Sequence, residues 1–114
     1  MVPINTPTRG ATHNLGPVGQ LPPGEGRLFE IGPDAHLVAV FRTRAGAVYA
    51  TQAQCPHRGG PLSDGTTGGT ILVCPLHGCR FDLATGGGPL DDDCEALKTF
   101  PINANAAGEL ILTL

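Results

Sequence analysis

The chain has 114 residues, a formal net charge of −3 and 15% charged residues. This length suits one small domain, and the mildly acidic charge argues against nucleic acid and anionic membrane surfaces as partners. The chain does not open with a basic segment followed by an apolar one, and no apolar run is long enough to span a bilayer. We therefore expect a soluble cytoplasmic protein that does not bind membranes.

The composition favours an all-β fold. The chain contains 17 glycines and 11 prolines, which fit turns between short strands because they follow no collagen-like period. Apolar residues show no convincing period of 3.6, so we expect little or no helix. The expected strands, in chain order, are residues 10–15, 27–31, 35–42, 47–52, 70–73, 80–83, 97–103 and 109–114.

Turn residues suggest how these strands pair. Residues 44–46 end in glycine and join 35–42 to 47–52 as a hairpin. Residues 97–103 and 109–114 are expected to form a final hairpin, and residues 82–86 a turn. His13 and His36 have no ligand partners nearby in the sequence, so we expect both on the surface. The fold class predicted is an antiparallel β sandwich or barrel-like structure.

Residues 55–77 carry the chemistry. Cys55 and His57 stand two positions apart, Cys74 and His77 stand three apart, and sixteen residues separate the pairs. Zinc and iron–sulfur clusters both accept thiolate and imidazole ligands. Zinc fingers usually keep like ligands together, whereas each pair here supplies one of each. This mixed pairing suits a binuclear centre, with both cysteines on one iron and both histidines on the other, although a zinc site remains an alternative.

The neighbours of these residues suit tight loops. Pro56 and Pro75 each follow a cysteine and restrict the backbone there. Gly59, Gly60 and Gly78 allow the backbone to approach a cluster closely and point N–H groups at its sulfides.

With these neighbours, C-P-H-R-G and C-P-L-H-G-C-R-F-D, the segment resembles the Rieske [2Fe–2S] motif. The resemblance covers nearly the whole chain. It implies one Rieske-type [2Fe–2S] cluster per chain, held by Cys55, His57, Cys74 and His77. It also implies a single domain, 1–114, in which a cluster-binding subdomain (53–84) is inserted into a basal β part (1–52 and 85–114).

Comparison with high-potential members of that family predicts a low reduction potential. Those members carry two further cysteines that form a disulfide, where this chain has Gly60 and Leu76. They carry a serine hydroxyl where this chain has Cys79, and a tyrosine hydroxyl where it has Phe81. Fewer hydrogen bonds to sulfur stabilise the reduced state less. We expect a value near the bottom of the range of about −150 to +300 mV for Rieske centres.

Three other features allow two interpretations each. Cys79 and Cys94 are expected as reduced thiols, with a disulfide between them as the alternative. Residues 86–90 lie where Rieske proteins carry a proline-containing loop over the cluster, but are rich in glycine here. Asp91, Asp92 and Asp93 could form an acidic docking patch or a solvated turn.

The chain offers no candidate for catalysis. It has neither a separate site with two histidines and a carboxylate nor a glycine-rich nucleotide fingerprint. The resemblance therefore implies an electron carrier that serves a flavin-dependent reductase and a terminal oxygenase, as in ring-hydroxylating dioxygenases. A small subunit of an NAD(P)H-dependent nitrite reductase or another oxidoreductase complex is the alternative, although such subunits often lack the ligands. His57 and His77 are expected near the surface, as the route for the electron.

Overall fold

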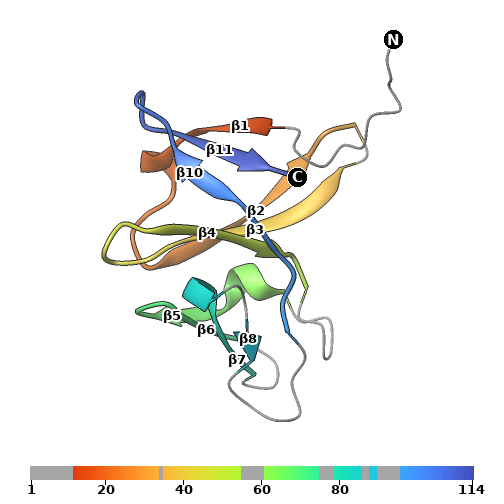
Figure 1. Ribbon diagram of the computed structural model, residues 1–114, viewed down its shortest axis with the longest axis vertical. Coiled ribbons are helices and arrows are strands. Elements are labelled where there is room, and N and C mark those ends of the chain that lie inside the picture. The colour runs from red at the N-terminus through yellow and green to blue at the C-terminus, as the bar shows by residue number, and fades with distance from the viewer. Residues whose placement is uncertain (1–11, 34, 55–60, 75–78, 86–87, 90–95) are drawn as a thin grey trace.

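The computed structural model describes residues 12–33, 35–54, 61–74, 79–85, 88–89 and 96–114. Within these ranges the chain forms eleven strands and three single-turn 3-10 helices. The strands make three sheets, and every pairing is antiparallel. Figure 1 shows the sheets stacked one above another. The predicted all-β class and the near absence of helix are confirmed.

The three sheets are built from strands that are not always neighbours in the sequence. The first has the order β1-β11-β10, with bounds Thr12–Pro17, Glu109–Thr113 and Ile102–Ala104. The second has the order β2-β3-β4-β9, with bounds Glu25–Ile31, His36–Arg42, Val48–Gln52 and Thr99–Phe100. The third has the order β5-β6-β7-β8, with bounds Thr66–Gly68, Ile71–Val73, Arg80–Asp82 and Gly88–Pro89.

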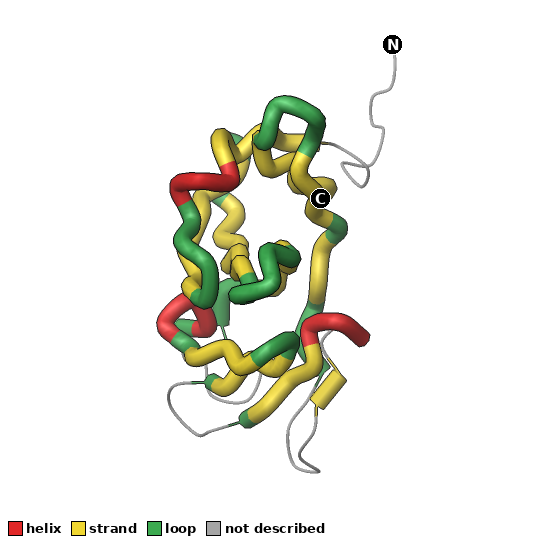
Figure 2. Tube along the Cα trace, turned by 90° about the vertical axis from the view of Figure 1, so that its left-hand side faces the viewer, coloured by secondary structure: helices red, strands yellow, loops and turns green. Residues whose placement is uncertain are grey.

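Three helical turns connect these strands: η1 (Val18–Gln20), η2 (Leu62–Asp64) and η3 (Leu83–Thr85). Figure 2 shows them around the periphery of the strands.

Residues 38–41 of strand β3 are buried on both faces of the sheet because this sheet is the middle layer. Successive side chains of a strand point to opposite sides. Val38 and Val40 therefore enter the core shared with the first sheet, whereas Ala39 and Phe41 enter the core shared with the third. The predicted hairpin is confirmed, since β3 pairs with β4 from Val38 opposite Gln52 to Arg42 opposite Val48.

The segment that leads into the third sheet, η2 and β5, lies against β2 of the second sheet. A Cβ atom placed on Gly26 of β2 would lie 3.0 Å from the Ser63 carbonyl of η2, and 2.6 Å from the ring of Phe41 on the neighbouring strand β3. The Thr67 hydroxyl also donates to the Gly24 carbonyl at 3.3 Å. These contacts bring η2, and with it the end of the first predicted cluster loop, onto the middle sheet.

The prediction of one strand over residues 97–103 is wrong. Thr99 and Phe100 pair with β4, but the chain then crosses to the first sheet, where Ile102 onward pairs with β11. Pro101 stands at the crossing and has no N–H to donate to a ladder. Its carbonyl instead accepts the Thr113 N–H at 2.9 Å.

Smaller differences follow from pairing that the sequence pattern did not reveal. Strands β5 and β8 were not predicted; both are short, and each pairs only with a neighbour in the third sheet. His13 was expected on the surface but is half-buried in β1, opposite Leu112. His36 is exposed, as predicted, and its ring meets that of Phe100 edge-on at 5.8 Å between centroids.

Candidate metal centre

Cys74 is the one predicted ligand within the described residues. It directly follows β6, is 1% exposed and has a free thiol. It lies in the core between the second and third sheets with Leu62, Leu72 and Phe81. The structure thus places a free thiol in an apolar environment. Cys55, His57 and His77 lie outside the described residues.

The second predicted loop is closed at its base by main-chain pairing. Strands β6 and β7 form a hairpin whose last ladder pair is Val73 with Arg80. One step further, the Cys74 N–H donates to the Cys79 carbonyl at 2.8 Å. The described residues on either side of 75–78 are therefore joined by main-chain hydrogen bonds.

The first predicted loop is closed in the same way. Gln54 and Pro61 form an isolated antiparallel bridge, and the Leu62 N–H donates to the Ala53 carbonyl at 3.0 Å. These contacts join the described residues on either side of 55–60, the segment of the sequence that contains Cys55 and His57. Cys74 therefore stands at one closed loop base, and Gln54, which precedes the predicted ligand Cys55 in the sequence, stands at the other.

The two loop bases pack against each other. Leu62, at the end of the first loop, and Cys74, at the start of the second, belong to the same buried cluster. Gly65 follows η2 and lies so close to β6 that an added Cβ would be 2.5 Å from the Val73 carbonyl. The fold thus places the start of the second loop beside the end of the first, although the loops are separate in sequence.

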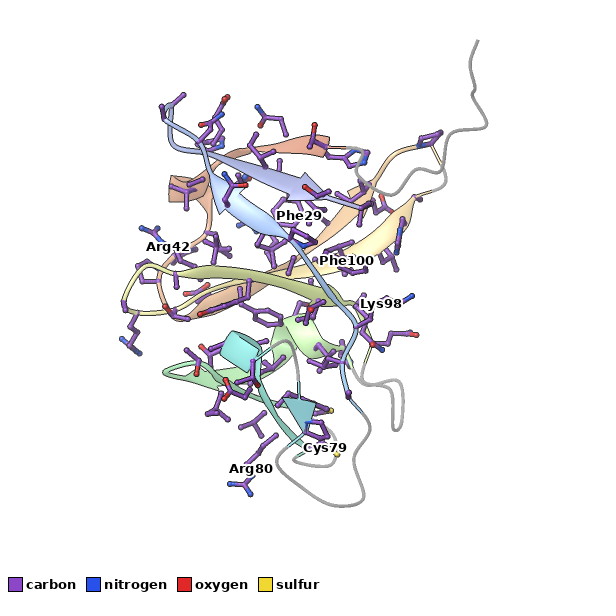
Figure 3. The ribbon with its side chains drawn as sticks, in the orientation of Figure 1. Phe29, Arg42, Cys79, Arg80, Lys98 and Phe100 are labelled. Atoms are coloured by element: carbon purple, nitrogen blue, oxygen red, sulfur yellow. The ribbon has the colours of Figure 1, made fainter. Side chains whose placement is uncertain are left out.

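Two of the residues that bear on the reduction potential are described. Phe81 is fully buried opposite Leu72 and has no hydroxyl to donate to a sulfur. Cys79 is 4% exposed and disulfide-bonded, so the expectation of a reduced thiol there is wrong. Cys94, Gly60 and Leu76 lie outside the described residues. Figure 3 shows Cys79 and Arg80 in the third layer, at the end of the molecule away from the first sheet.

Comparison with known proteins decides the family. A sequence model described as Rieske [2Fe–2S] domain matches residues 12–101. The chain belongs to this family. Membership implies a [2Fe–2S] cluster as the cofactor. The free, buried thiol of Cys74 fits this group, because thiolate is the ligand form that iron–sulfur clusters take.

Several Rieske proteins resemble the chain over most of its length. The biphenyl dioxygenase ferredoxin subunit of Pseudomonas sp. (strain KKS102) is 36% identical over 95 residues, which covers 82% of this chain and 84% of that protein. A chain in the complex of reduced oxygenase and oxidized ferredoxin in carbazole 1,9a-dioxygenase superposes with a TM-score of 0.77 at 28% identity, covering 91% of this chain and 94% of that one.

A further solved structure shows the same fold. It is the putative NADH-dependent nitrite reductase small subunit from Mycobacterium tuberculosis, with a TM-score of 0.81 at 24% identity, covering 91% of this chain and 95% of that one. Within the part of this Rieske chain that the structure describes, no helix has the length and apolar character needed to cross a membrane.

Sequence reasoning missed two residues that make contacts near the loop bases. Gly65 was not singled out from the sequence, and Gln52 was interpreted only as the last residue of a strand. The close contact of Gly65 with β6 cannot be recognised in the sequence, because an ordinary S-D-G turn without that contact would have the same residues. Gln52 likewise gives no local signal of its contact with Lys98, which lies 46 positions away in the sequence.

Proposed function

We propose that the protein is a Rieske-type ferredoxin, a one-electron carrier of a multicomponent ring-hydroxylating oxygenase system. It would hold one [2Fe–2S] cluster per chain, with Cys55 and Cys74 on one iron and His57 and His77 on the other. Electrons would arrive from a flavin-dependent reductase and leave to a terminal oxygenase. The observation that carries this proposal is the buried, free thiol of Cys74 at a loop base packed against that of the other predicted loop.

The relatives favour this role over that of a nitrite reductase subunit. Proteins named as ferredoxin components of dioxygenase systems match at 32% to 40% identity, whereas the nitrite reductase small subunit shares 24% and supports only the fold. The chain also keeps both cysteine–histidine pairs. As a carrier, it is a component of an oxidoreductase system rather than an enzyme with its own substrate.

The chain's own residues would shield the cluster from water and provide the route by which the electron leaves. The cluster, when bound, accepts and donates a single electron. Leu62, Leu72 and Phe81 exclude water around Cys74 and keep its surroundings apolar. The histidines would bind through one ring nitrogen and present the other N–H toward a partner, which makes them the shortest exit for the electron.

Several finer points form part of the same proposal. Residues 53–84 would be the cluster-binding subdomain, with 1–52 and 85–114 as the basal part. Asp91, Asp92 and Asp93 would either steer a basic partner or form a solvated turn. We propose the cytoplasm as the compartment, with neither nucleic acid nor membrane as a partner.

The direct test is reduction by candidate flavin-dependent reductases, followed by visible absorption and EPR. Purified protein should contain two irons per chain and should pass electrons on to a terminal oxygenase. A colourless protein that binds one zinc ion would refute the proposal. Stable, stoichiometric co-purification with a larger oxidoreductase would favour the subunit role instead.

The reduction potential gives a quantitative prediction. Voltammetry of the wild-type protein should give a midpoint near the bottom of the range of about −150 to +300 mV. Phe81→Tyr should raise it, because the new hydroxyl would stand where high-potential relatives donate to a cysteine sulfur. Phe41→Tyr is the matched control, since Phe41 is equally buried in the same core but lies on β3. A wild-type value well above zero, or equal shifts in the two variants, would contradict this prediction.

A further inference from the structure

Gln52, the last residue of β4, uses all of its polar groups. Its main-chain N–H donates to the Lys98 carbonyl at 2.8 Å, and its side-chain Oε1 accepts the Lys98 N–H at 2.7 Å. Its Nε2 donates to the Gln54 carbonyl at 2.7 Å. The Thr51 hydroxyl donates to its main-chain carbonyl at 2.8 Å.

The chemistry of the partners fixes the orientation of the Gln52 amide. A main-chain N–H can only donate and a main-chain carbonyl can only accept, so the oxygen must face Lys98 and the nitrogen must face Gln54. A flipped amide would place two donors together on one side and two acceptors on the other.

The Gln52 side chain replaces a main-chain hydrogen bond that is missing from the sheet. In the ladder between β4 and β9, Ala50 pairs with Phe100 and Thr51 with Thr99. If the antiparallel ladder continued regularly, Gln52 and Lys98 would form the next pair and exchange two main-chain hydrogen bonds. Here the Lys98 N–H binds the Gln52 side chain instead of its main-chain carbonyl. That carbonyl is free to turn toward Thr51, so the chain can leave the sheet without losing the bond to Lys98.

The two segments joined by this amide both lead to the predicted cluster. Gln54 immediately precedes Cys55, the first predicted ligand. Lys98 lies 46 residues further along the chain than Gln52 and follows Leu97, which is buried in the core that contains Cys74. Figure 3 shows Lys98 at the side of the molecule, between the second and third layers.

We propose that Gln52 is a positioning residue for the cluster, an inference that rests on the proposed function. Its amide clamps the start of the first ligand loop to the strand that returns from residues 90–95. The clamp holds the main chain just before Cys55 in one place. Without it, the Gln54 carbonyl and the Lys98 N–H lose their partners together, and the base of the loop opens on this side.

The test compares Gln52→Met with Gln20→Met. Gln20 is the matched control because its Nε2 also donates to a main-chain carbonyl at 2.7 Å, that of Leu15, in the first part of the chain. Each holoprotein is challenged with an iron chelator while its visible absorption is followed. We expect Gln52→Met to lose the cluster about tenfold faster than wild type, as is typical when a residue that orients a metal ligand is removed. Gln20→Met should keep the wild-type rate.

Two further measurements separate positioning from general stability. Gln52→Glu keeps an acceptor for the Lys98 N–H but cannot donate to the Gln54 carbonyl, so its rate should fall between those of wild type and Gln52→Met. The EPR g-values should change in Gln52→Met and stay unchanged in Gln20→Met, even where both variants lose the same thermal stability.

Equal rates of cluster loss and equal spectra in Gln52→Met and Gln20→Met would overturn the inference. The same holds if Gln52→Glu matches wild type in both measurements. If wild-type protein itself holds no [2Fe–2S] cluster, the proposed function fails and this inference fails with it. Measuring whether the wild-type protein holds a cluster therefore distinguishes failure of the proposed function from failure of this inference alone.

Discussion

Protein carrying Cys74→Ala should fold but contain no [2Fe–2S] cluster. Cys74 places a free thiol in an apolar core, where it lies 1% exposed at the base of the second loop. Alanine removes the sulfur without adding bulk, and its methyl group cannot bind iron. Visible absorption, EPR and iron content should all fall to background, a loss of well over tenfold in bound iron.

Leu72→Ala is the control for this result. Leu72 is fully buried in the same core, two residues before Cys74, and its truncation removes more apolar surface. It should lower the free energy of unfolding by about 2–5 kcal/mol yet leave the spectrum of the folded protein in place. A coloured Cys74→Ala protein, or loss of the cluster in both variants while they remain folded, would show that the assigned ligand set is wrong.

Gly65→Ala should weaken both the fold and cluster binding. A Cβ atom at Gly65 would lie 2.5 Å from the Val73 carbonyl and 3.0 Å from the Leu62 carbonyl, and neither is a flexible side-chain end. The φ angle of Gly65 is −72°, which alanine adopts without strain, so any effect must come from this contact. Moving η2 away from β6 separates the two loop bases. We expect a loss of about 1–3 kcal/mol in the free energy of unfolding, as for other overpacked sites, together with lower iron content.

Gly68→Ala provides the matched comparison. Gly68 lies in the adjacent strand β5, and an added Cβ there would meet no atom within 4 Å. Its free energy of unfolding should stay within about 0.5 kcal/mol of wild type, with full iron content. Urea denaturation of both holoproteins, with iron analysis, measures the difference. Equal behaviour of the two variants would mean that the loop bases do not depend on the close packing of η2 and β6.

Local patterns account for the parts of the fold that were predicted well. The hairpin of β3 and β4 joins segments that are adjacent in sequence, and Gly46 supplies the positive φ, +96°, that its turn requires. The segment 97–103 was predicted poorly because its two halves pair with different sheets. Pro101 marks the crossing, but a proline alone cannot tell which partner each half will choose.

The sequence by itself determined the chemistry of this protein. Two thiols and two imidazoles at a characteristic spacing predict the metal centre, because ligand type is a property of the residues themselves. Only the tertiary structure decided how the loops that carry those residues are held. Gly65 against β6, the Cys74–Cys79 main-chain bond and the bonds of Gln52 to Lys98 depend on where the packed sheets bring the main chain together. Such contacts can join residues as much as 46 positions apart, and no short pattern encodes them.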